Sequence, residues 1–165
     1  MHYGASDNMF LEVLMPRLLV SVLLSLFLAA SAVAGENATI VIPTKHSFKT
    51  LVARLDTAIA KHKMFPVTRA SASIGASGRG IKIRGNMVVG VYRNDFALRM
   101  LEASVPAGIE APIRFYITEN ADGTAGLAYR KPSVVFAPYK GGAKLKALAA
   151  ELDTIFAAIA RDAVR

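Results

Sequence analysis

Alternating apolar and polar residues in the second half of the chain predict a β-hairpin. In residues 113–118, Ile, Phe and Ile alternate with Arg, Tyr and Thr, and residues 124–130 alternate with the same period of two. That period is typical of strands with one buried face. Asn120, Asp122 and Gly123 lie between the two runs and favour a tight reversal, and Pro132 should end the pairing because it cannot donate a ladder hydrogen bond. A lone hairpin is marginal in water, so the rest of the chain must supply more strands and covering helices.

Apolar stripes with helical spacing predict those covering helices. A first helix should begin at Ser47, as its N-cap, and extend to about Lys63. Its apolar stripe consists of Phe48, Leu51, Val52, Leu55 and Ile59. A last helix should follow Gly141 and Gly142, with an apolar stripe that consists of Leu145, Leu148, Leu152, Ile155 and Ile159. Between them, Asp95 is expected to cap a short helix through Ala103, with Phe96, Leu98 and Leu101 partly inward.

Short β-type runs complete the predicted architecture. They cover residues 38–43, ending at Pro43, residues 65–72, and residues 87–92, which are nearly all apolar and should form a central strand buried on both faces. Residues 133–139 have no clear period and suggest an extended connection or a short turn. The order βαββαββα predicts the α+β class, as a two-layer sandwich: a mainly antiparallel sheet of about five strands covered by three helices.

Residues 1–34 have the layout of a secretory signal peptide. Arg17 supplies the positive charge, residues 18–30 are apolar, and Ala32-Val33-Ala34 is a small-x-small cleavage site. The apolar run is shorter than the ~20 residues that span a bilayer, so we expect no stable membrane span after cleavage near Ala34. An uncleaved signal anchor is the alternative, and Met15 is a second candidate start. Cleavage would leave residues 35–165 as a single domain, periplasmic or secreted in a bacterial envelope.

Composition narrows the classes of partner and chemistry. The formal net charge of the chain is +8, and residues 35–165 carry about one charge more because the leader is slightly acidic. Export argues against nucleic acid as the partner of this charge, which leaves a small or anionic ligand, an envelope surface, an unknown protein partner, or simple solvation. The chain has no cysteine, which excludes disulfides, thiolate metal sites, covalent c-type haem and thiol catalysis.

Residues 101–132 resemble the domain of unknown function 302 family. The pattern of that family, P-x-x-G-I-x-x-P-I/L-[KR] followed by an acidic D-G turn and Y-x-x-P, is matched by Pro106, Gly108, Ile109, Pro112, Ile113, Arg114, Glu119, Asp122, Gly123, Tyr129 and Pro132. The order of elements extends the resemblance to roughly residues 38–163. It implies the two-layer α+β fold of the family, for which no general activity is established.

Two departures from the family pattern affect function. Members often carry an Asp-His pair where this chain reads Ser71-Ala72, and many carry F-G-N-P where this chain reads Val91-Tyr92-Arg93-Asn94. No catalytic residue therefore transfers from the resemblance.

The glycine-rich basic segment 73–85 is the sequence-based candidate for a binding site. Arg79, Lys82 and Arg84 lie among four glycines, whose backbone amides could hold an anion together with these side chains, and Arg93 follows the next strand. The segment matches neither the phosphate loop G-x-x-x-x-G-K-[ST] nor G-x-G-x-x-G, and the alternative interpretation is a mobile hairpin loop.

Neither catalytic, metal nor cofactor residues emerge from the rest of the sequence. His46 and His62 lie about 24 Å apart at the ends of one predicted helix, so they cannot share an ion. No serine lies in a G-x-S-x-G elbow. We therefore expect a small-ligand or anion-binding module of the envelope. A protein-interaction module with a basic surface and an enzyme of unrecognised type stay open: an exposed flat apolar patch would favour the former, and a buried carboxylate with a raised pKa the latter.

Overall fold

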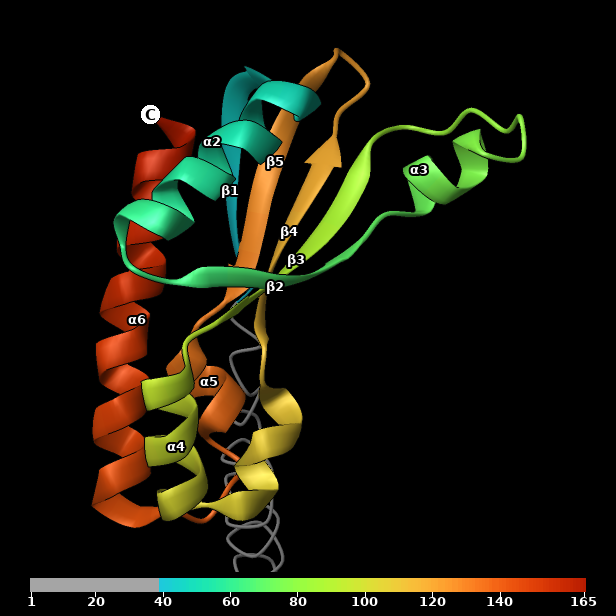
Figure 1. Ribbon diagram of the computed structural model, residues 1–165. Helices are drawn as coiled ribbons and strands as arrows, with labels where there is room; N and C mark the ends of the chain where they lie inside the picture. Colours follow the sequence, from blue (N-terminus) through green and yellow to red (C-terminus); the bar gives the residue numbers. More distant parts are fainter. Residues whose placement is uncertain (1–38) are drawn as a thin grey trace, which may run out of the picture. The chain divides into compact units, whose positions relative to one another are not determined.

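The computed structural model describes residues 39–165, which form a five-stranded antiparallel sheet (Figure 1). The predicted leader lies outside the described residues. The strands are β1 (Thr39–Ser47), β2 (Phe65–Ala70), β3 (Asn86–Tyr92), β4 (Ile113–Glu119) and β5 (Thr124–Arg130). Their order in the sheet is β1-β5-β4-β3-β2, so the hairpin β4–β5 lies inside the sheet while β1 and β2 form its edges.

Helices cover one face of this sheet. The helices are α2 (Phe48–Lys61), α3 (Ala72–Ser77), α4 (Asn94–Ala103), α5 (Pro132–Phe136) and α6 (Gly142–Val164), with a 3₁₀ helix, η2 (Val105–Glu110), after α4. Figure 1 shows α2 and α6 on one side of the sheet and α3 on the other, while α4 packs against α6 beyond the end of the strands. The predicted α+β sandwich is confirmed, with α3 and α5 as two short helices beyond the three expected.

The central hairpin forms as its alternation predicts. Phe115 pairs with Tyr129, and Ile117 with Leu127, so the apolar residues of both strands share one face. Gly123 adopts a φ of 82° in the turn, a conformation that glycine tolerates at little steric cost. Asp122 accepts a hydrogen bond from the backbone N–H of Thr124 at 3.0 Å, which fixes the end of the reversal.

Aromatic side chains join the sheet to the longest helix. The ring of Phe156 in α6 stacks on Phe115 at a centroid distance of 4.9 Å and lies 6.2 Å from Tyr129. Phe115 and Phe156 are almost fully buried. Phe156 lies outside the stripe that the sequence predicts for this helix, because the buried face of α6 is wider than one row of residues.

Polar contacts hold the carboxyl end of α6 against α2. Arg54 donates to the carbonyl oxygens of Ala163 and Asp162, two groups left without helical partners at the end of α6. Lys61 and His62 both contact the carboxylate of Asp162 at 2.9 Å. Hydrogen bonds from Lys61 and His62 lower the pKa of Asp162 to about 2.

Several predicted element boundaries need correction. β1 continues through Pro43 to Ser47, with a register shift after Pro43, because an edge strand has a free side on which the missing N–H is tolerated. Residues 132–136 form a helix, α5, where an extended connection or a short turn was expected. In β3, Met87, Val89 and Val91 are buried but Val88 is half-exposed, since the helices cover one face only.

The start and inner face of α4 also differ from expectation. Asp95 lies inside the helix and is not its N-cap, a position that Arg93 occupies without a side-chain capping bond. Phe96 is buried as expected, but Leu98 and Leu101 are exposed. Ala97 and Met100 take the inward positions, because α4 packs mainly against α6 and η2.

Candidate functional site

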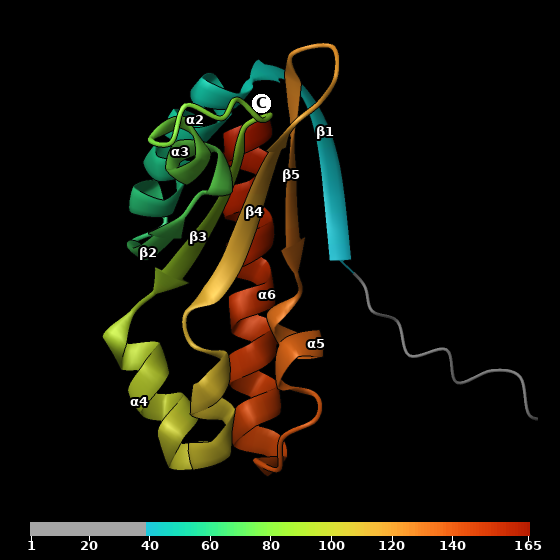
Figure 2. The same cartoon turned by 90° about the vertical axis from the view of Figure 1, so that its right-hand side faces the viewer.

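The face of the sheet opposite α2 and α6, here called the open face, is the face turned to the viewer in Figure 2. The strand register arranges its side chains in rows that cross the sheet. One row is apolar and runs through Val41, Ala128, Tyr116, Val88 and Ala70. Val41 and Tyr116 are 68% and 43% exposed. Large apolar side chains on a solvated sheet face can receive a ligand or partner.

The neighbouring row on the open face contains two arginines side by side. Because Phe115 pairs with Tyr129, the adjacent residues Arg114 and Arg130 lie directly opposite each other on β4 and β5. Cross-strand neighbours of this kind have Cβ atoms about 4.5–5.5 Å apart. Both side chains are exposed, and neither takes part in an ion pair with the described residues. Like charges in this arrangement repel unless an anion neutralises them.

A hollow of about 280 Å³ lies beside the arginine pair. Its lining residues are Thr39, Val88, Glu110, Ile113, Arg114, Tyr116, Ala128, Tyr129, Arg130 and Val135. Glu110, at the end of η2, is the carboxylate in this lining, and the hydroxyl of Tyr139 donates to it at 2.6 Å. The lining of the hollow thus combines apolar side chains with two arginines and one glutamate.

No carboxylate of the described chain forms an ion pair with these arginines. All nine Asp and Glu side chains of residues 39–165 already accept hydrogen bonds or ion pairs from other groups. Five of them bind Lys or Arg side chains, and these five cations are Lys61, Arg69, Arg93, Arg99 and Lys144. Arg114 and Arg130 belong to the surplus of positive charge.

The predicted basic residues Arg79, Lys82 and Arg84 lie together on a projecting segment between β2 and β3. The segment contains the short helix α3 and is not the simple hairpin loop that its glycines suggest. All three side chains are exposed and take part in no ion pair with the described residues. The structure does not enclose a cavity around them.

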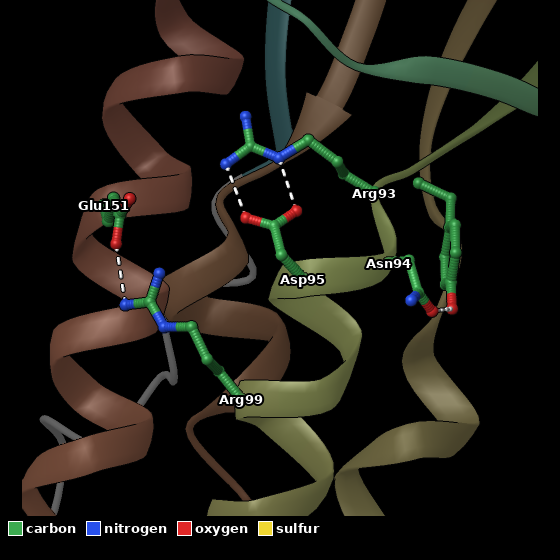
Figure 3. A network of polar contacts seen from close by, with 6 residues as sticks. Arg93, Asn94, Asp95, Arg99 and Glu151 are labelled. Carbon is green, nitrogen blue, oxygen red and sulfur yellow. Dashed lines mark hydrogen bonds and ion pairs between the residues drawn. The ribbon is translucent and has the colours of Figure 1, made fainter.

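Arg93 directly follows β3 at the end away from that segment, about 26 Å from Gly85 by the rise of ~3.3 Å per strand residue. Figure 3 shows its guanidinium group paired with the carboxylate of Asp95 through two hydrogen bonds, of 2.6 and 2.9 Å. It also lies 4.0 Å from the ring centroid of Phe96. Arg93 lowers the pKa of Asp95 mainly through this hydrogen bonding. Arg93 is thus held by its own helix and separated from the other predicted binding residues.

Two further cavities fit a ligand less well. The apolar cavity beside Arg93 has a volume of about 30 Å³, which suffices for little more than one water molecule. A wider depression of about 690 Å³ lies between α2 and the end of α6. Two of its cations, Arg54 and Lys61, are already bound to the carbonyls and carboxylate at the end of α6.

Residues 39–165 contain two histidines, His46 and His62, as possible metal ligands besides the carboxylates. This part of the chain contains no group of three or more His, Asp or Glu side chains arranged to hold a metal ion. His62 contacts Asp162, while the backbone N–H of His46 donates to Thr44. None of the described helices is long and apolar enough to cross a membrane.

The arginine pair could have been identified from the sequence. The alternation places Arg114 and Tyr116 on the polar face of β4, and the D-G turn fixes the register that sets Arg114 against Arg130. Charge together with glycine content points instead to residues 73–85. Strand register is therefore the signal that would have identified Arg114 and Arg130.

The fold and the sequence agree on a family. The family model described as "Domain of unknown function DUF302" matches residues 40–162. A crystal structure of an uncharacterized conserved DUF302 protein from Bacillus stearothermophilus is similar to this chain, with a TM-score of 0.65 and 17% identity. The likeness covers 77% of this chain and 98% of that one. No curated protein matches the sequence significantly.

Proposed function

We propose that this chain, which belongs to the DUF302 family, is a binding module that holds a small oxyanion on the open face of its sheet. The observation that carries the proposal is the register of β4 and β5: extended by one residue beyond the Phe115–Tyr129 pair, it sets Arg114 opposite Arg130, and neither arginine forms an ion pair with a described residue. A carboxylate or phosphate monoester between the two guanidinium groups would form charge-assisted hydrogen bonds with both.

The apolar row gives the ligand its second recognition element. Tyr116, Val88 and Ala128 line the same hollow as the arginines. A ligand whose anionic end lies between Arg114 and Arg130 would place an apolar body against these side chains. A hollow of about 280 Å³ is near the lower end of small-molecule sites, which favours an aryl or short alkyl group.

The cell envelope is the proposed location of this binding. The sequence of residues 1–34 has the n-region, h-region and small-x-small site of a signal peptide, which supports export. Small organic anions that enter the envelope space would then be the available ligands. Detection of the processed protein in a periplasmic extract, with Gly35 at its N-terminus, tests this part separately from ligand binding.

A titration with benzoate tests the ligand site. We expect benzoate to shift the backbone amide resonances of β4 and β5, and the neutral isostere benzamide to bind at least tenfold more weakly because it lacks the charge. Replacement of both arginines, R114Q with R130Q, should lower benzoate affinity at least tenfold without lowering the melting temperature, since both side chains are exposed. Phenyl phosphate in place of benzoate shows which oxyanion the pair prefers.

A charge-matched variant provides the control. R79Q with R84Q removes the same charge from the projecting segment and should leave benzoate affinity within twofold of the parent. Loss of binding in this variant, with binding kept in R114Q/R130Q, would contradict the open-face site and move the site to the segment that contains Arg79, Lys82 and Arg84. Equal binding of benzamide and benzoate would contradict anion recognition altogether.

Enzymatic activity has no comparable support. The carboxyl groups with a clearly shifted pKa are Asp95, Glu102, Asp122 and Asp162, and each shift is downward because cations or hydrogen-bond donors stabilise the charged form. A general acid that works near neutral pH needs the opposite shift. Hence none of these four carboxyl groups has the shift that such an acid needs.

A further inference from the structure

Residues 71–85, here called the arm, project from the sheet on the side opposite α2 and α6 (Figure 1). Hydrogen bonds stabilise the arm, both between its own residues and at its base, where it joins the sheet. Ser71 caps α3, and the N–H of Ile81 returns to the carbonyl of Ala76 at 3.0 Å. At the base, the side chain of Asn86 accepts from Ala72 N–H, and Glu119 accepts from Gly85 N–H at 2.6 Å. The arm is therefore an ordered projection with a fixed root.

The last residue of the arm, Gly85, lies close to Phe48 of α2, and this contact fixes the path of the chain from the arm into β3. A Cβ atom at Gly85 would lie 2.6 Å from Cγ of Phe48, so the backbone can pass this ring only because residue 85 is glycine. Beyond this point the chain continues into β3 at Asn86. The contact anchors the arm although its tip makes few contacts with the body of the protein.

The surface of the arm combines exposed aliphatic side chains with positive charge. Ile74, Ile81 and Ile83 are 63%, 50% and 46% exposed. Lys82 and Arg84 alternate with two of these isoleucines along an extended stretch, and Arg79 precedes them. No acidic residue occurs between Asp56 and Asp95 in the sequence, so nothing on the arm offsets its three positive charges.

We propose that the arm binds the surface of an anionic lipid bilayer, with its isoleucines at the boundary between head groups and acyl chains. Exposed aliphatic side chains that alternate with Lys and Arg match such a surface, because the former enter the apolar boundary while the latter remain beside anionic head groups. Projection from the sheet would let the arm reach the bilayer ahead of the rest of the domain. The proposal does not depend on the ligand site.

Charge favours a lipid surface over a second copy of this chain. Self-association through the arm would bring Arg79, Lys82 and Arg84 of one copy toward the same residues of another or toward Arg114 and Arg130 of the open face. Such juxtapositions of like charge are unfavourable. An anionic bilayer instead neutralises every exposed cation of the arm at once.

Single tryptophan residues provide the first test, because the chain contains no native tryptophan. In I83W, addition of vesicles of phosphatidylglycerol and phosphatidylcholine should shift the emission to the blue, and brominated lipids should quench it. L98W, in an exposed position of α4 outside the arm, is the matched control and should show neither effect. The tryptophan reports insertion of the arm itself even if the leader remains attached. An unchanged I83W spectrum on bound vesicles, or a blue shift in L98W, would overturn the proposal.

Measurements of vesicle affinity separate the contribution of the cations of the arm from that of its isoleucines. The variant R79Q/K82Q/R84Q should bind phosphatidylglycerol vesicles about 100-fold more weakly, since each cation near an anionic surface contributes about a fivefold factor. I81S/I83S should also weaken vesicle binding, whereas R114Q/R130Q should still give the blue shift of I83W. Arm variants that bind vesicles as well as the parent would contradict the proposal. So would a dimer in solution that I81S/I83S dissociates without lipid, which would identify a second copy as the occupant.

Discussion

The two faces of the sheet differ in burial, although their residues alternate along the same strands. In β4, Phe115 and Ile117 are fully buried beneath the helices, while their neighbours Arg114 and Tyr116 are exposed on the open face. The next residue along a strand points to the other face. Packing therefore restricts the choice of side chain closely at one position and hardly at all at the next. The covered face stabilises the fold, and the open face carries charged and aromatic side chains, which the proposed function assigns to binding.

The same contrast applies to charge. Several ion pairs lie on the helical side of the sheet: Arg69 of β2 binds Asp56 of α2, and Arg99 in α4 binds Glu151 of α6. On the side of the open face, the five cations of the arm and the arginine pair take part in no ion pair with the described residues. Paired charges join helices to one another, whereas unpaired charges on a projecting or open surface are available to an external anion.

Truncation of one side chain on each face should give the largest difference between the faces in the free energy of unfolding. Phe115→Ala removes a ring that stacks on Phe156 and should lower the free energy of unfolding by about 3–5 kcal/mol. Tyr116→Ala, the next residue, should cost less than about 1 kcal/mol because its ring is exposed. Urea denaturation of both variants measures the difference. Similar losses would mean that something packs on the open face as tightly as the helices pack on the other.

Alanine substitutions at two glycines of the open face should distinguish a position where neighbouring atoms fill the space from one where the space is free. A Cβ atom at Gly90 would lie 2.7 Å from Cγ of Pro112 and closer still to Thr68, so Gly90→Ala should destabilise the protein by about 1–3 kcal/mol. At Gly126 the nearest atom would be 3.8 Å away, and Gly126→Ala should be neutral or stabilise by up to about 1 kcal/mol. Thermal unfolding of the pair measures both effects. A loss at Gly126 as large as that at Gly90 would show that the open face is filled near both residues.

Strand and helix periodicity made most of the fold predictable. The alternation in residues 113–130, the turn at Asp122 and Gly123, and the stripes of α2 and α6 are local signals, and each formed the expected element. The errors arose where tertiary context decides. Pro43 does not end β1 because β1 became an edge strand, and Leu98 is exposed because α4 extends beyond the sheet.

The candidate site was harder to predict than the fold. The basic residues Arg79, Lys82 and Arg84 belong to one segment, but whether a segment encloses a cavity or projects into solvent depends on its packing, which composition does not reveal. Arg93 is close to them in sequence, yet the length of β3 separates it from them. The pairing of Arg114 with Arg130 follows only from the register of the hairpin, which requires both strands to be considered together.

The ion pairs of the covering helices should give stability a specific pH dependence. The pKa of Asp162 is about 2, below its usual value near 3.8, chiefly because Lys61 and His62 donate hydrogen bonds to its carboxylate. This contribution is present above pH 4 and is lost as the pH falls through about 2. The melting temperature of Asp162→Asn should therefore lie below that of the parent at pH 5, and the two should converge near pH 2. We expect a smaller effect than at Gly90, since ion pairs near the surface contribute little. A constant difference down to pH 2 would show that the carboxylate charge is not responsible.

The smallest effect should come from the arginine pair, with a sign opposite to that of the substitutions on the covered face. Arg130→Gln removes one of two like charges that lie directly opposite each other and should raise the free energy of unfolding by a few tenths of a kcal/mol up to about 1 kcal/mol without added anion. Arg79→Gln removes the same charge from the arm, away from this pair, and is the control for net charge. Urea unfolding at low and high salt measures the gain. The gain should shrink at high salt, where the Debye length falls to about 3 Å at 1 M and the repulsion is screened. If Arg130→Gln destabilises the protein at low salt, the two guanidinium groups do not repel each other. That result would contradict the proposal that an anion binds between them.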